Sequence, residues 1–92
     1  MSRPPNIIFI GKKPIMTYVN ATLTLLSNEP IVTIKARGKS ITTAVDVSQM
    51  IVKRLNAVGY KISGVRIFSE RLTSQDGKER NVSTIEVDIS CP

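Results

Sequence analysis

Two short cationic turns carry the side chains of this chain that are best suited to chemistry. The first turn, with sequence GKKP, places Lys12 and Lys13 side by side, and the second, KARGKS, holds Lys35, Arg37 and Lys39. Ammonium and guanidinium groups donate charge-assisted hydrogen bonds that suit phosphate oxygens. Each turn follows an apolar stretch and precedes a helical pattern. We therefore expect both turns to lie at helix N-termini, where free backbone N–H groups also favour anions.

Most catalytic and metal sites need residue types that this chain lacks. It has no histidine and a single cysteine, Cys91, which excludes histidine-based triads, histidine metal sites and thiolate clusters. The tripeptide GKS at residues 38–40 matches the end of a nucleotide-binding P-loop, but Thr33 occupies the position of the motif's first glycine. Glu86 and Asp88 lie on the outward phase of a predicted strand, which indicates a solvated sheet face. We predict no enzyme activity, no metal and no other cofactor.

The charge of the chain is unevenly distributed. Its 13 Lys and Arg against 7 Asp and Glu give a formal net charge of +6. Residues 1–39 contain six cations and one acid, whereas residues 40–92 contain seven cations and six acids. A basic surface of this kind attracts polyanions such as nucleic acids, although the same charge also keeps a small protein soluble.

Length and hydropathy indicate one small domain spanning residues 1–92. The apolar fraction of 41% is enough for a core, and the apolar runs are too short to span a bilayer. The segment MSRPP at residues 1–5 lacks the apolar stretch of a signal peptide. This predicts an intracellular protein without membrane contact, in which Cys91 forms no intrachain disulfide.

The hydrophobic pattern predicts the order strand, helix, strand, helix, strand, strand, an α/β chain of the two-layer α+β type. The expected ranges are residues 6–10, 14–26, 31–37, 41–58, 60–72 and 81–91. The first strand is a nearly continuous apolar run, which is typical of burial on both faces. Pro14 is expected at the first helical position, Ser40 is expected to cap the second helix, and Gly59 to end it.

Helical periodicity predicts which side of the second helix faces the core. Val47 and Met50 are expected on a flank of this helix, and Asp46 could pair with Lys39 or Arg37 of the same or a neighbouring subunit. The predicted core-facing residues are Ile41, Ala44, Val45, Ser48, Ile51, Val52 and Leu55.

A parallel pairing of the first two strands would bring the two cationic turns to the same sheet edge. Lys12, Lys13, Arg37 and Lys39 would then form one basic surface that binds a phosphate backbone. The four aromatic side chains form no spaced stacking platform, which favours contact with backbone and shape over bases. These aromatic residues are Phe9, Tyr18, Tyr60 and Phe68.

The last two strands are expected to form a hairpin with a polar tip. The dipeptide DG at residues 76–77 is a strong turn signal, and Ser63-Gly64 is a candidate bulge. Arginine and asparagine are common visitors to the minor groove, so the hairpin is a candidate groove-binding arm; the alternative is an inert solvated turn. The residues that would make these contacts are Arg71, Lys78, Arg80 and Asn81.

Taken together, these motifs resemble the Alba family of archaeal chromatin proteins. The matching stretches run in order along nearly the whole chain: IGKKP at 10–14, IKARGKSI at 34–41, AVD at 44–46, TSQDG at 73–77 and VSTIE at 82–86. The resemblance implies a β-α-β-α-β-β fold like the C-terminal domain of bacterial translation initiation factor three. It also implies a homodimer, in the cytoplasm and on the chromosome, that binds double-stranded DNA with little sequence preference and also binds RNA.

The resemblance further assigns roles to individual residues. Lys12 and Lys13 match the paired lysines of the family's central DNA-binding surface, with the basic residues at 37 and 39 beside them and two hairpin arms reaching toward the minor groove. Lys12 matches a lysine whose acetylation weakens DNA binding. Leu55 matches the phenylalanine through which many members join dimers side by side, and is a departure from it. Arg80-Asn81 also departs from the usual small residue followed by arginine.

The residues leave two other binding functions open. An RNA chaperone or a ribonucleoprotein subunit would use the same basic surface as a DNA-binding protein. A scaffold that binds only proteins would not need Lys12.

Overall fold

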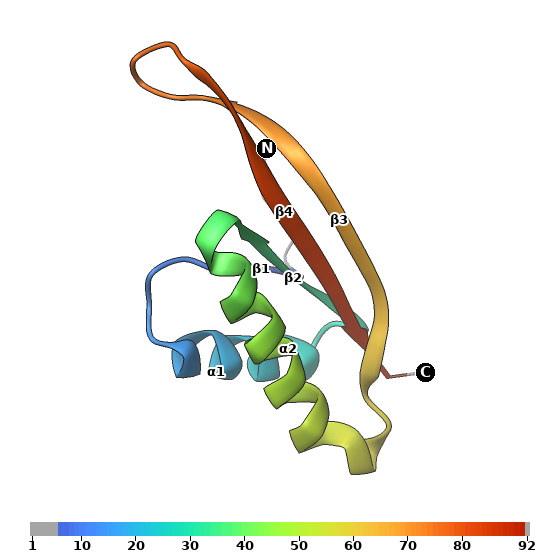
Figure 1. The fold of residues 1–92 in the computed structure, drawn as a ribbon. Helices are drawn as coiled ribbons and strands as arrows, with labels where there is room; N and C mark the ends of the chain where they lie inside the picture. The colour runs from blue at the N-terminus through green and yellow to red at the C-terminus, as the bar shows by residue number, and fades with distance from the viewer. Residues whose placement is uncertain (1–5, 92) are drawn as a thin grey trace.

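The computed structural model describes residues 6–91, so the segment 1–5, on which the expected lack of a signal peptide rests, lies outside the described residues. The elements follow the predicted order, and Figure 1 shows them as two helices against one sheet. They are β1 (Ile7–Phe9), α1 (Ile15–Leu26), β2 (Ile31–Arg37), α2 (Ile41–Leu55), β3 (Lys61–Thr73) and β4 (Glu79–Ser90). Within residues 6–91, no helix has both the length and the apolar character needed to cross a membrane.

The four strands form one sheet in the order β1-β2-β4-β3, with both helices on the same face (Figure 1). β1 and β2 are parallel, and β4 pairs antiparallel with both β2 and β3. β1 is therefore a short edge strand with helices on one side only. The prediction that it is buried on both faces is wrong, since Phe9 is 37% exposed.

The core lies between the helices and the inward side chains of β2 and β4. Alternate residues of β2, including Val32 and Ile34, are buried against the helices, as strand periodicity predicts. In α2 the core-facing line runs through residues 44, 47, 48 and 51, so Val47 is fully buried and Val45 is 43% exposed. The predicted places of these two valines are wrong, because apolar side chains on both sides of the line left its phase undetermined.

The helix ranges agree with prediction except at the first residue of α1 and the last turn of α2. Gly38–Ser40 forms a 3-10 turn before α2, and Ser40 makes no side-chain capping bond. Pro14 lies one residue before the helix, where its carbonyl accepts a 2.9 Å hydrogen bond from the Thr17 N–H. The last predicted turn of α2 tightens into a 3-10 turn at Asn56–Val58, and Gly59 ends it at a left-handed φ of 100°.

The hairpin of β3 and β4 is the longest feature of the molecule. Figure 1 shows it extending well beyond the helices, and the molecule measures 48 × 28 × 22 Å. A register shift between Ile62 and Gly64 confirms the predicted bulge. At the tip, the Asp76 carboxylate accepts hydrogen bonds from the Ser74 hydroxyl and the Lys78 N–H, and Gly77 adopts a φ of 83°. Local turn chemistry therefore closes the hairpin.

Candidate functional site

The two cationic turns leave the sheet at the same edge. Parallel pairing aligns Ile8 with Ile34 and Phe9 with Lys35, so both turns follow the C-terminal ends of neighbouring strands. A 2.9 Å bond from the Ile10 N–H to the Lys35 carbonyl extends this pairing to the start of the first turn. The predicted juxtaposition of the turns is confirmed.

A buried tyrosine holds the first turn. The Tyr18 hydroxyl oxygen accepts hydrogen bonds from the Gly11 N–H at 2.8 Å and the Lys13 N–H at 3.0 Å. Both donors belong to the backbone on either side of Lys12, so the hydroxyl fixes the path of the turn that carries the lysines. The sequence pattern identifies Tyr18 only as one of four aromatic side chains. Its position in the first turn of the following helix was the available signal.

Three lysines at this edge are fully available to a ligand. Lys12, Lys13 and Lys39 are exposed, and none of them makes an ion pair with any residue in the 6–91 segment. The N-terminal backbone N–H groups of α1 and α2 follow closely in the chain and add partial positive charge. The edge therefore presents exposed cations and helix N-termini on the same side of the molecule.

Arg37, the fourth predicted cation of this edge, is already paired. Its Nε lies 3.2 Å from Glu70 Oε1 and its Nη2 lies 3.0 Å from Glu70 Oε2, a bidentate contact across β4. The Thr84 hydroxyl also donates to Glu70 at 3.1 Å. The hydrogen bonds from Arg37 are the main cause that holds the pKa of Glu70 below its ordinary value; burial opposes them, and the bond from Thr84 adds to the lowering. Within residues 6–91 of one chain, Asp46 makes no ion pair with Arg37 or Lys39, and its pairing with a neighbouring subunit stays a prediction.

Lys35 points away from the edge, onto the sheet face that no helix covers. Its Nζ lies 5.9 Å from the ring centres of both Phe9 and Phe68, and 3.4 Å from Glu86. Arg37 lies two residues further along β2 and therefore points to the same face, where it also contacts Glu70. Of the three cations in the second turn, only Lys39 lies beyond the strand, in the 3-10 turn that follows it.

Glu86 and Asp88 lie on this uncovered face, as their strand phase predicts. Arg66 donates to Glu86 at 2.8 Å and to both oxygens of Asp88 at 2.8 Å, and the Thr33 hydroxyl donates to Asp88 at 2.7 Å. Hydrogen bonds from Arg66 are the main cause that lowers the pKa of each of these carboxylates. They belong to an ion-pair network and not to an acid–base pair.

The predicted hairpin residues do not share one face. Arg71 pairs with Asn81 across the hairpin, and the next residue pair, Leu72 with Arg80, points to the other side. Arg71 also forms an ion pair of 3.4 Å with Glu79, while Lys78 is exposed in the turn. Contacts from this arm would therefore wrap around it and not extend along one side.

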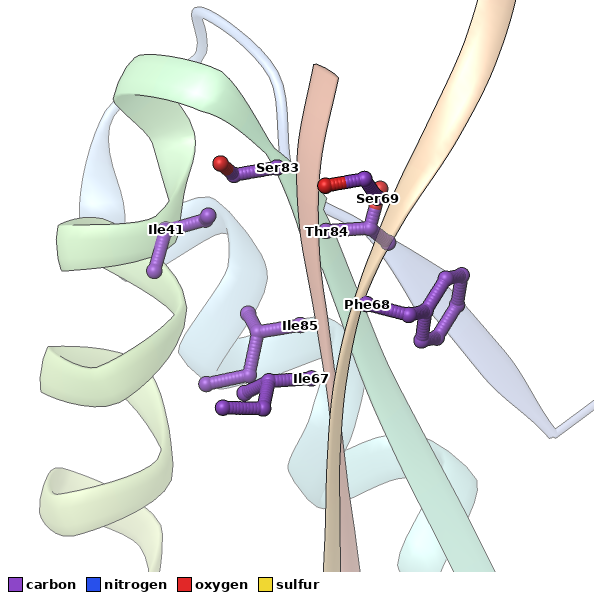
Figure 2. Close-up of a pocket in the computed structure, with 7 residues that line it drawn as sticks. All are labelled: Ile41, Ile67, Phe68, Ser69, Ser83, Thr84 and Ile85. Atoms are coloured by element: carbon purple, nitrogen blue, oxygen red, sulfur yellow. The ribbon is translucent and has the colours of Figure 1, made fainter. Parts of the chain in front are cut away.

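An apolar hollow of about 380 Å³ lies between the start of α2 and the base of the hairpin. Figure 2 shows Ile41, Ile67 and Ile85 on the helix side of the sheet, with the Phe68 ring on the opposite side. A smaller hollow continues along the same face beside Val45 and Val65. Ile67 is 78% exposed and Val65 is 55% exposed, so this face is unusually apolar for a surface.

Two further features bear on the predicted sites. Leu55 is partly buried and packs against the core at the end of α2. Within the described residues, no group of three or more acidic or cysteine side chains is placed to hold a metal ion.

Comparison with known proteins matches this chain to one family. The Alba family model matches residues 6–69. The DNA/RNA-binding protein Alba of Nitrosopumilus maritimus is 57% identical over 82 residues, covering 89% of this chain and 86% of the relative. The protein of the same name from Methanococcus maripaludis is 42% identical over 84 residues, covering 89% and 93%.

Solved structures give the same result. Alba from Thermoplasma volcanium superposes with a TM-score of 0.82 at 42% identity, covering 92% of this chain and 99% of that one. An Alba protein from Trypanosoma brucei superposes with a TM-score of 0.74 at 25% identity, covering 98% and 72%. The expected fold is thereby confirmed.

Proposed function

This chain belongs to the Alba family, and we propose that it binds nucleic acid, chiefly double-stranded DNA, with little sequence preference. The observation that carries the proposal is the single sheet edge on which Lys12, Lys13 and Lys39 are exposed without an ion pair in residues 6–91. The relatives' name, DNA/RNA-binding protein Alba, supports it.

The mechanism is electrostatic. Lysines beside a duplex displace condensed counterions from phosphates, which yields affinity for any sequence and makes that affinity dependent on salt. If two protomers each engage three phosphates, about six phosphates are neutralised and the slope of log affinity against log salt is about −5. Lys12 and Lys13 are held in place by Tyr18, so little loop ordering remains to be done on binding.

The binding unit is a homodimer joined through the apolar face. The hollow beside Ile41, Ile67 and Ile85 continues into the hollow beside Val45 and Val65. Both lie on the helix side of the sheet, next to the part of β3 that the helices do not cover (Figure 2). A second copy would cover these side chains and place two basic edges in one surface.

The hairpin arms extend that surface along the duplex. Arg71 and Asn81 point to one side of the arm and Arg80 to the other, with Lys78 at the tip, so an arm lying in a minor groove would contact both of its walls. This is the arrangement of a chromatin protein that coats DNA in an archaeal cytoplasm.

Two residues would change how tightly the protein binds DNA and how neighbouring dimers contact one another. Acetylation of Lys12 would remove one phosphate-facing charge and lower both affinity and salt dependence. Leu55 would provide the contact between neighbouring dimers, through the part of its side chain that the core leaves exposed.

The alternative is an RNA-directed role, which the relatives' printed name also supports. The test is a competition in which labelled duplex DNA, prebound at fixed salt, is displaced by unlabelled duplex DNA or structured RNA of equal length. A main role on DNA predicts that the unlabelled duplex displaces the label at lower concentration than RNA. Displacement by RNA at lower concentration would reverse the assignment.

A further inference from the structure

Arg37 and Glu70 form an ion pair at the proposed binding edge, and this pair has a role beyond stabilising the fold. Arg37 ends β2 and Glu70 belongs to β3, so the guanidinium reaches across β4 to make its two contacts of 3.2 and 3.0 Å. The side chains are 41% and 23% exposed, respectively. An exposed pair of this kind contributes little to folding and is easily opened.

A carboxylate presents the same two-oxygen edge to a guanidinium as a phosphate does. Glu70 therefore occupies the Nε–Nη2 edge of Arg37 that a backbone phosphate would take, and it adds a negative charge beside that place. Lys35 also lies 3.6 Å from Glu70, so a second cation is partly neutralised by the same carboxylate.

The surrounding cluster has no spare charge. It contains three cations and three acids in mutual contact: Lys35, Arg37, Arg66, Glu70, Glu86 and Asp88. Arg66 is engaged by Glu86 and Asp88, and Lys35 is held between two rings, so Glu70 has no other exposed cation to satisfy it as fully as Arg37 does. A phosphate that binds Arg37 must displace Glu70 or accept it as a neighbour.

We propose that Glu70 is an internal competitor for Arg37, which lowers the affinity of the binding edge for nucleic acid. The inference rests on the proposed nucleic-acid binding and adds a residue that sets its strength. Bound phosphate replaces Glu70 on Arg37, and Glu70 keeps its hydrogen bond from Thr84 and its ion pair with Lys35. The protein thus binds a polyanion with less affinity, and releases it faster, than its count of cations implies.

The test compares Glu70→Gln with wild type in duplex DNA binding at several salt concentrations. Glutamine keeps the size and one acceptor oxygen, so the fold should persist, which thermal unfolding checks. The expected result is a roughly two- to fivefold higher affinity and a salt slope steeper by about one. Glu29→Gln is the matched control, since it changes net charge equally at the opposite end of β2.

A second comparison tests whether the effect passes through Arg37. In an Arg37→Ala background, Glu70→Gln should change affinity no more than Glu29→Gln does. An equal gain in both backgrounds would mean general charge repulsion and overturn the proposal. A loss of affinity in Glu70→Gln would mean that Glu70 supports Arg37 in binding, which also overturns it.

Failure of this inference is distinguishable from failure of the proposed function. If wild type binds duplex with a steep salt slope and Glu70→Gln gains nothing, only the role of Glu70 is wrong. If wild type shows no salt-dependent binding, the proposed function fails. In that case, titration with inorganic phosphate, followed by NMR at the Arg37 Nε–H resonance, tests directly whether Glu70 competes with phosphate for Arg37. Equal shifts in wild type and Glu70→Gln would refute this competition.

Discussion

Tyr18 and Glu70 are the two residues on which the chemistry of the binding edge depends most after the lysines themselves. They differ in how far they act along the chain: Glu70 meets Arg37 across 33 residues, whereas Tyr18 bonds to the turn just before its own helix. The cations and their turn could be predicted, because their spacing is local. The acid partner of Arg37 could not, because strand alternation and sheet order decide which acid meets which cation.

Replacing Tyr18 by phenylalanine should loosen the lysine turn. The substitution removes the acceptor for two backbone N–H groups and should lower the free energy of unfolding by about 1 kcal/mol. DNA affinity should fall severalfold because the lysines must be ordered on binding. Thermal unfolding and duplex titration measure the two effects.

Tyr60→Phe is the control for this substitution. Its hydroxyl donates one long bond of 3.5 Å to the Leu26 carbonyl, away from the cationic turns. DNA affinity equal to wild type in Tyr18→Phe would contradict the role assigned to the hydroxyl.

At the scale of elements, ion pairs link β2, β3 and β4 on the sheet face opposite the helices, where no second layer of structure packs in the described residues. Hydrogen bonds from arginine lower the pKa values of Glu70, Glu86 and Asp88 in the folded state. Between these lowered values and the ordinary values near 4, the unfolded chain binds more protons than the folded one. Their contribution is therefore complete above the ordinary values and is lost as pH falls through the lowered ones.

Stability should accordingly decrease as pH falls from about 5 to about 3. Replacing Asp88 by asparagine should flatten this decrease, because the substituted side chain no longer titrates, while lowering stability at neutral pH. Thermal midpoints measured across this range test the expectation. A decrease of equal steepness in wild type and Asp88→Asn would show that these carboxylates do not control acid stability.

The helices and strands themselves followed from their periodicity, and the errors have local causes. The Ser40 side chain makes no capping bond to α2, since Gly38–Ser40 forms a 3-10 turn that leads directly into the helix. Val45 and Val47 exchanged places because α2 carries apolar residues on two sides. One side faces the core and the other faces the open apolar hollow, and sequence periodicity alone does not distinguish them.

For the whole molecule, the topology and the shared edge of the two turns could be predicted from the order of elements and the handedness of parallel strand connections. The apolar face beside β3 could not, since Val65 and Ile67 lie at inward positions of a strand and read as core. They are exposed because the two helices are too narrow to cover a four-stranded sheet whose hairpin extends past them (Figure 1).

If a second copy covers this face, Ile67→Glu should convert the dimer to a monomer, because it buries a charge against apolar side chains. Sedimentation equilibrium measures the change. Val58→Glu is the matched control, since Val58 is also exposed but lies in the turn after α2, outside the hollow. A monomeric wild type, or an Ile67→Glu variant that dimerises normally, would place the dimer contact elsewhere or remove it.

The most direct measurement is the salt dependence of duplex DNA affinity for wild type and for Lys12→Ala/Lys13→Ala. The substituted side chains are exposed, so the variant should fold normally. A steep slope in wild type, reduced in the variant by about two for each engaged protomer, is the expected result. A shallow slope in wild type, or a variant that binds as tightly with the same slope, would contradict the basic edge as the binding surface.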